Sequence, residues 1–191
     1  MKKPTPKRKS QNRKAVEKSA PKPKNKRPAS PASSQPIGLK TILVPIDFSD
    51  NSKKALRYAI PFAQQFNASL ILAYIVEPTI YPSDFGFGQI GFPDVEKELH
   101  EKALSEMATL RDSIIPPGLR TVTLVGTGIP FVEITQFAKE HEVDIIIVAT
   151  HGRTGVEHIL FGSTAEKIIR KAPCPVLVVR SEEHDFIDER V

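Results

Sequence analysis

The amino-acid sequence predicts an α/β fold: a single open, parallel, five-stranded sheet with helices on both faces, which is a doubly wound, Rossmann-like arrangement. Five short segments that suit strands, most of them strongly apolar, alternate along the chain with four segments whose apolar residues recur every three or four positions. Strands that alternate with helices in this way pair in parallel and are joined by right-handed crossovers. Ligands of such sheets bind beyond the carboxyl ends of the strands, where the strand order reverses.

The first strand is expected at residues 41–46 (TILVPI) and the second at 69–76 (SLILAYIV), because continuous apolar runs suit strands buried on both faces. A helix is expected between them, since a polar cluster at residues 49–52 offers N-caps. Pro61 lies inside this helix and is a candidate for a kink. The apolar residues at helical spacing are Ala55, Ala59, Phe62, Ala63 and Phe66.

The second half of the chain continues the alternation. Pro130 suits the first turn of a helix, and Ser163 and Glu166 are spaced as a capping box at the start of the last helix. The remaining elements are expected at residues 94–113 (helix), 120–125 (strand), 130–141 (helix), 143–149 (strand), 163–171 (helix) and 175–180 (strand).

Charge divides the chain of 191 residues into unlike parts. Residues 1–36 hold twelve basic residues and a single acidic one, Glu17, whereas the remainder holds fifteen basic and twenty-one acidic residues, so the two parts carry +11 and −6. Seven of the seventeen prolines also fall in residues 1–36, which have almost no large apolar side chain. We therefore expect a disordered basic tail at 1–36, a folded domain at 37–181 and a short acidic tail at 182–191.

Several classes of protein are not supported. The single cysteine, Cys174, excludes an intramolecular disulfide and a CxxC site, and it is expected to be a small buried residue in a reducing compartment. No apolar stretch is long enough for a membrane span, and the basic N-terminus is not followed by the apolar core of a signal peptide, so a cytoplasmic location is expected and a transmembrane one is not. The histidines show no metal-ligand spacing, and the Walker pattern is absent. No metal ligand is assigned.

The loop after the fourth strand has the composition of a phosphate site. It begins with Ala149, Thr150, His151, Gly152 and Arg153, and Gly162, Ser163 and Thr164 lead into the last helix. Glycines let the backbone approach an anion, helix N-terminal amides point outward, and the hydroxyls add donors, while Arg153 and His151 can supply charge. The alternative is that the glycines only end a strand and a turn and that Ser163 only caps its helix.

With these residues in place, the sequence resembles the universal stress protein family over about residues 38–181. Nucleotide-binding members carry G-x2-G-x9-G-S/T at this loop. Gly152 matches the second glycine, and Gly162 and Ser163 match the end of the pattern, whereas Ala149 stands in place of the first glycine. The resemblance implies that this loop holds the phosphates of ATP, with or without Mg²⁺.

The resemblance extends to the first strand, where Val-Pro-Ile-Asp-Phe-Ser at residues 44–49 is similar to the family's V-P-x-D-x-S segment. It implies that Pro45, Ile46 and Asp47 line a nucleoside pocket and that Ile75 faces the adenine. From the residues alone, Asp47 has a second interpretation as an Asx turn or helix cap.

The resemblance thus predicts a dimeric, ATP-binding protein of the stress response, in which the last strand pairs with its twofold mate. Two alternatives remain open from the sequence. One is a slow ATP hydrolase, although no general base is evident; the other is an interaction protein of the same fold that binds no nucleotide. The basic tail adds a further expected partner, a nucleic acid or an anionic surface bound through its charge.

Overall fold

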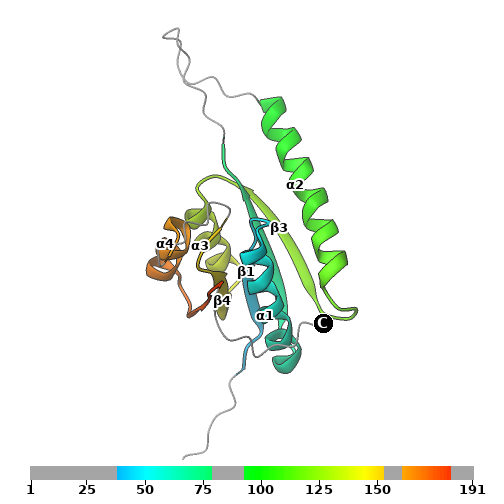
Figure 1. Ribbon diagram of the computed structural model, residues 1–191, viewed down its shortest axis with the longest axis vertical. Coiled ribbons are helices and arrows are strands. Elements are labelled where there is room, and N and C mark those ends of the chain that lie inside the picture. The colour runs from blue at the N-terminus through cyan, green and yellow to red at the C-terminus, as the bar shows by residue number, and fades with distance from the viewer. Residues whose placement is uncertain (1–37, 79–92, 153–160, 182–191) are drawn as a thin grey trace, which may run out of the picture. The chain divides into compact units, whose positions relative to one another are not determined.

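The computed structural model describes residues 38–78, 93–152 and 161–181 (Figure 1). Strands and helices alternate throughout these residues. In chain order they are β1 (Thr41–Pro45), α1 (Asp50–Phe66), β2 (Ser69–Val76), α2 (Pro93–Ile114), β3 (Thr121–Thr127), α3 (Pro130–Glu140), β4 (Ile145–Ala149), α4 (Ser163–Lys171) and β5 (Val176–Val179). No helix in this part of the chain has the length and apolar content needed to cross a membrane.

The five strands form one sheet in the order β3-β2-β1-β4-β5, and every neighbouring pair is parallel. This arrangement confirms the predicted doubly wound fold. The chain builds the sheet outward from β1 to β3 and then returns to the other side of β1 for β4. The strand order therefore reverses between β1 and β4, and that is where such folds place their ligands.

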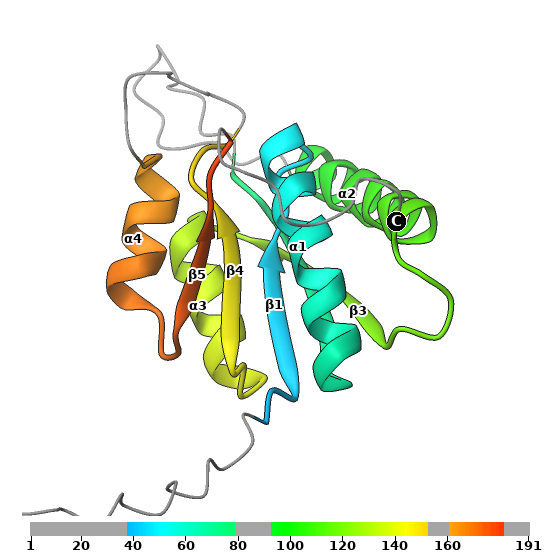
Figure 2. The same ribbon diagram turned by 60° about the horizontal axis from the view of Figure 1, so that its bottom comes forward.

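Two apolar clusters cover the two faces of the sheet. One lies beneath α1 and α2 and contains the fully buried Leu56 and Met107, and the other lies beneath α3 and α4 and contains Ile134 and Ile168. Figure 2 shows the two pairs of helices on opposite sides of the strands. Strands that are buried on both faces account for their continuously apolar sequences.

The central strands are held together at one end and separate at the other. Asp144 lies just before β4, and its Oδ2 accepts hydrogen bonds from the backbone amides of Lys40 (2.6 Å) and Thr41 (2.9 Å) at the start of β1. The ladder between β1 and β4 ends at Leu43, whereas the ladder between β1 and β2 continues to Pro45. The carboxyl ends of β1 and β4 therefore leave space between them.

Most predicted elements are confirmed within two residues, and α1 continues through Pro61 to Phe66. The predicted capping box of α4 is wrong. Gly162 is the N-cap, without a side-chain cap, and the Glu166 carboxylate instead pairs with Arg170 at 3.0 Å. The backbone amide of Gly162 bonds the carbonyl of Thr150 at 2.7 Å, so a contact with the preceding loop sets where this helix begins.

Candidate functional site

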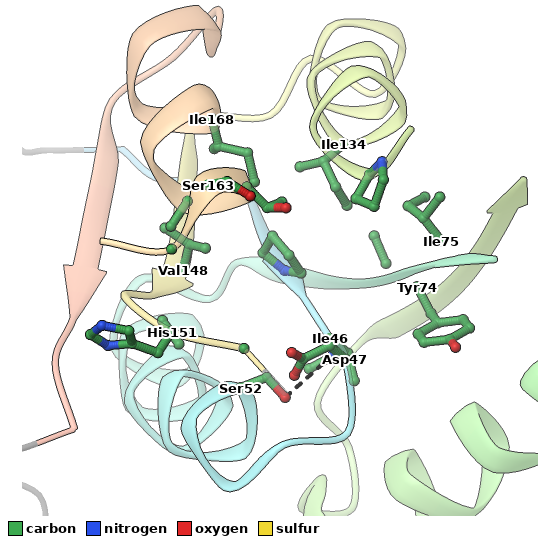
Figure 3. Close-up of a pocket in the computed structure, with 18 of the residues that line it drawn as sticks. Ile46, Asp47, Ser52, Tyr74, Ile75, Ile134, Val148, His151, Ser163 and Ile168 are labelled. Carbon is green, nitrogen blue, oxygen red and sulfur yellow. Dashed lines mark hydrogen bonds between the residues drawn. The ribbon is translucent and has the colours of Figure 1, made fainter. Parts of the chain in front are cut away.

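A cavity of about 340 Å³ opens at the carboxyl ends of the central strands. Its lining comes from the carboxyl ends of β1, β2 and β4, from the residues that follow these strands, and from α1, α3 and α4 (Figure 3). The lining residues with polar side chains are Asp47, Ser52, Tyr74, Glu77, Thr150, His151, Ser163 and Thr164. Cavities of this size hold small molecules in other proteins.

Asp47 leaves β1 in a tight turn that fixes its carboxylate. Oδ1 accepts hydrogen bonds from the backbone amide of Ser49 (3.0 Å) and from the Ser49 hydroxyl (2.5 Å). Phe48 adopts a left-handed backbone with φ of 64°, which is uncommon for a bulky residue. Its ring packs against Tyr74, with the centroids 4.9 Å apart.

Ser52 supports this turn from within α1. Its side chain is almost completely buried, and its hydroxyl donates to the carbonyl of Ser49 at 2.9 Å while accepting from the backbone amide of Asp47 at 3.4 Å (Figure 3). The Ser49 hydroxyl caps α1 by accepting from the amide of Ser52 at 3.2 Å. The expected Asx turn is therefore present, but it occupies Oδ1 of Asp47 and leaves the carboxylate in the lining of the cavity.

Gly152 lies against the other oxygen of this carboxylate. A Cβ atom at Gly152 would overlap Oδ2 of Asp47 and would lie 3.5 Å from its Cγ. A side chain at position 152 and the Asp47 carboxylate in its present place exclude each other. The segment after β4 and the segment after β1 are thus in direct contact across the point where the sheet order reverses.

Backbone hydrogen bonds hold both ends of the loop between β4 and α4. The amide of Thr150 donates to the carbonyl of Val179 in the neighbouring strand at 2.9 Å, and the carbonyl of Thr150 accepts from Gly162. A Cβ atom at Gly162 would lie 3.3 Å from that carbonyl oxygen. The Thr150 hydroxyl lies 3.0 Å from Nδ1 of His151 and is buried with the rest of its side chain.

The N-terminus of α4 faces the cavity. The first intrahelical hydrogen bond is donated by Glu166 to the carbonyl of Gly162 at 3.0 Å. The amides of Ser163, Thr164 and Ala165 precede it in the helix, and the N-cap residue, Gly162, has no side chain to accept from them. These residues line the cavity, so the positive end of the helix dipole is directed toward it.

Apolar side chains form the lining between Asp47 and α4. Ile75, Ile134, Val148 and Ile168 belong to the cluster beneath α3 and α4, and each is less than a tenth exposed. Ala149 behaves differently, because its side chain belongs to the cluster on the α1 side of the sheet. Successive residues of a strand point to opposite faces, so the methyl group of Ala149 lies on the other side of β4 from Val148.

The structure brings ten of the eleven predicted site residues to this one cavity, and Arg153 lies outside the described residues. The ten are Pro45, Ile46, Asp47, Ile75, Ala149, His151, Gly152, Gly162, Ser163 and Thr164. Their part in binding stays a prediction.

Sequence reasoning did not assign several other lining residues to the site, among them Ser52, Tyr74 and Glu77. Tyr74 and Glu77 carried one usable signal, because they lie at or after the end of the second strand and therefore at the same edge of the sheet as Asp47. Ser52 was not assigned to the site because it belongs to the polar cluster at residues 49–52, and an ordinary helix start contains such a cluster as well.

Cys174 lies near the opposite end of the sheet, and it is half-buried. Burial raises the pKa of its thiol, a backbone hydrogen bond with Ile146 opposes this change, and the Asp144 carboxylate raises the pKa further. A thiol of this kind is neutral at physiological pH. Within the described residues, no group of three or more histidine, cysteine or carboxylate side chains is arranged to hold a metal ion.

Comparison with known proteins identifies a family and several relatives that this chain is similar to. The model of the universal stress protein family matches residues 38–180. Universal stress protein MJ0531 of Methanocaldococcus jannaschii is 34% identical over 149 residues, which are 76% of this chain and 85% of that protein. MJ0577 of the same organism is 31% identical over 153 residues, which are 74% of this chain and 94% of that protein.

Solved structures agree with these matches. The structure of MJ0577 superposes with a TM-score of 0.65 and 28% identity, covering 78% of this chain and all of that one. The universal stress protein UspA of Lactobacillus plantarum superposes with a TM-score of 0.60 and 28% identity, covering 76% of this chain and all of that one. The family match begins three residues before β1 and ends one residue after β5, so it includes every described helix and strand, and the chain therefore belongs to the universal stress protein family.

Proposed function

We propose that this protein binds ATP in the cavity between β1, β2 and β4 and acts in the stress response of the cytoplasm. The observation that most supports this proposal is the distribution of polar groups around the cavity. One side carries the Asp47 carboxylate, which only accepts hydrogen bonds, and another carries the amides and hydroxyls at the start of α4. Apolar side chains such as Ile75 and Val148 lie between these two groups.

A nucleoside triphosphate matches this distribution. Its sugar hydroxyls can donate to the Asp47 carboxylate, as acidic residues at strand ends do in dinucleotide folds. Its base is a flat, largely apolar group suited to Ile75, and its phosphates suit the N-terminus of α4, where backbone amides and the helix dipole favour an anion. The carboxylates of Asp47 and Glu77 repel phosphate, so electrostatics favours this one orientation of the ligand.

Mg²⁺, where present, is expected to arrive with the nucleotide. It is usually bound by phosphate oxygens and water together with one or two carboxylates, and it does not require a dedicated cage of protein ligands. Binding is favoured over turnover in this proposal, because the described residues of the loop, 149–152 and 161–164, include no carboxylate that could act as a general base at the terminal phosphate.

Calorimetric titration of the full chain with ATP and Mg²⁺ tests this function. We expect a dissociation constant between about 1 μM and 1 mM, which is about −8 to −4 kcal/mol. Absence of both heat and a thermal shift at millimolar ATP would contradict the proposal and favour an interaction protein that binds no nucleotide.

Valine variants at the two loop glycines localise the site. Gly152→Val and Gly162→Val are each expected to abolish ATP binding, because a valine side chain in this loop would displace the nucleotide. A Cβ atom at Gly152 would also overlap Oδ2 of Asp47, and one at Gly162 would lie only 3.3 Å from the carbonyl oxygen of Thr150. Gly38→Val is the matched control. Gly38 precedes β1 at the other end of the sheet, nothing lies within 4 Å of a Cβ atom there, and this variant should bind ATP like the wild type. Equal binding by all three variants would exclude this cavity as the site.

A further inference from the structure

The loop glycines face different neighbours, although the sequence motif treats them alike. The space that a side chain would need at Gly162 is limited by the backbone carbonyl of Thr150 at 3.3 Å. The space that it would need at Gly152 is occupied by Oδ2 of Asp47, a side-chain atom from the segment after β1. The lack of a side chain at position 152 therefore leaves room for the Asp47 carboxylate at least as directly as it can leave room for a phosphate.

The carboxylate is also held from the opposite side. Ser49 binds Oδ1 through its amide and its hydroxyl, and the buried hydroxyl of Ser52 joins the amide of Asp47 to the carbonyl of Ser49. Between them, Phe48 keeps its left-handed backbone, an unfavourable conformation that persists only where its surroundings hold it. Ser52 is part of those surroundings, since its hydroxyl bonds the residues on both sides of Phe48.

We infer that Gly152 and Ser52 are positioning residues for the Asp47 carboxylate, and that together they set the preference of the site for a nucleotide whose sugar carries hydroxyl groups. This inference depends on the proposed nucleotide binding and assigns Gly152 to the sugar end of the ligand. Because Gly152 has no side chain, Oδ2 of Asp47 can occupy the space beside it. Ser52 stabilises the turn from which the Asp47 carboxylate projects.

The first test compares ATP with 2′,3′-dideoxy-ATP, which lacks both sugar hydroxyls, by calorimetry on the full chain. Hydrogen bonds to a charged group predict that the wild type prefers ATP by about tenfold or more. Gly152→Ala and Ser52→Ala should reduce this preference to about twofold or less and leave the affinity for the dideoxy nucleotide within about threefold of the wild type. Ser163→Ala is the matched control at the phosphate end, where both nucleotides should lose affinity by the same factor.

The second test is a double-mutant cycle, because coupled residues show non-additive effects. In the Asp47→Ala background, Gly152→Ala should no longer weaken ATP binding, since the carboxylate that it displaces is gone. Gly162→Ala serves as the matched glycine, and its effect should be the same with and without Asp47. Thermal unfolding without nucleotide supplies an independent reading: Gly152→Ala should lower Tm when Asp47 is present and should lower it less when Asp47 is replaced.

The outcomes separate this inference from the proposed function. Failure of the wild type to bind either nucleotide would overturn both. The wild type could instead bind ATP, while Gly152→Ala lowers the affinity for both nucleotides equally and its effect adds to that of Asp47→Ala. That result would overturn only the inference and would assign Gly152 to the phosphate end of the ligand.

Discussion

At the residue scale, Ala149 shows how a family motif can change without closing the site. The residue ends β4 at the position of the motif's first glycine, and its side chain is buried in the cluster on the α1 side of the sheet. A methyl group in that place adds to the core. Ala149 is still among the residues that line the cavity, so the substitution is compatible with a close approach of the ligand to the loop.

Ala149→Gly is therefore expected to leave ATP affinity within about twofold of the wild type. The same change should destabilise the domain by about 1 kcal/mol, because it removes a buried methyl group and adds backbone freedom to the unfolded chain. Calorimetry and chemical denaturation measure the two quantities. A tenfold gain in affinity would contradict this account and would place the methyl group in the ligand's path.

Cys174 leads to a prediction about reactivity. Since burial raises the pKa of its thiol, the folded protein should react with a disulfide reagent at pH 8 more slowly than the chain unfolded in guanidinium does. A pKa raised by folding stabilises the folded state below the ordinary thiol pKa, and this contribution is lost as the pH rises through the folded value. Equal reaction rates for the two states would contradict the prediction.

At the scale of single elements, β5 forms one edge of the sheet. It is an edge strand of four residues, and Val176, Leu177 and Val178 are only partly covered within this chain. Unpaired edge strands are usually covered by another element or by a second copy of the chain. The other edge, β3, differs because α2 packs along it and only Val122 among its larger side chains is more than half exposed.

We predict that β5 pairs with its twofold mate to form a homodimer. Light scattering at micromolar concentration should then give about twice the 21.2 kDa of the chain. Val178→Lys should shift the protein toward the monomer, because a charge at an edge opposes pairing, and circular dichroism would verify that the variant is folded. Val122→Lys on β3 is the control and should leave the dimer intact. A wild-type monomer would contradict the prediction.

At the scale of the whole molecule, charge separates the two ends of the sequence. Residues 1–36 carry +11 and the remaining residues −6, so any affinity for nucleic acid or an anionic surface is expected in the basic tail. ATP binding should not depend on the tail, because the lining of the cavity lies between Pro45 and Ile168.

A salt titration of DNA binding tests this assignment. If about six cations of the tail contact duplex DNA, the logarithm of the affinity should fall against the logarithm of salt concentration with a slope of about −5. A protein that begins at residue 37 should not bind DNA and should keep its affinity for ATP. Retention of DNA binding by the truncated protein would indicate a nucleic-acid site on the domain itself.

The sequence alone was sufficient for the order and type of the elements and for the end of the sheet where a ligand would bind. Both follow from local patterns. Continuous apolar runs, three- and four-residue spacings and glycine-bearing loops report on each segment's own burial and turns, and parallel strands bring all their carboxyl ends to one edge. The assignment of Asp47, Ile75 and Ser163 to one site came from the resemblance to the universal stress protein family, and the structure brings these three residues together at that edge.

Only the tertiary structure decided which atoms meet within that site. Oδ2 of Asp47 occupies the place of a Gly152 side chain, the carbonyl of Thr150 sets the start of α4 at Gly162, and the methyl group of Ala149 packs away from Val148. Each of these depends on the order and register of strands that are remote in the sequence. Local patterns specify which face of a segment is buried, but the neighbour that it meets is determined by the packing of the whole domain.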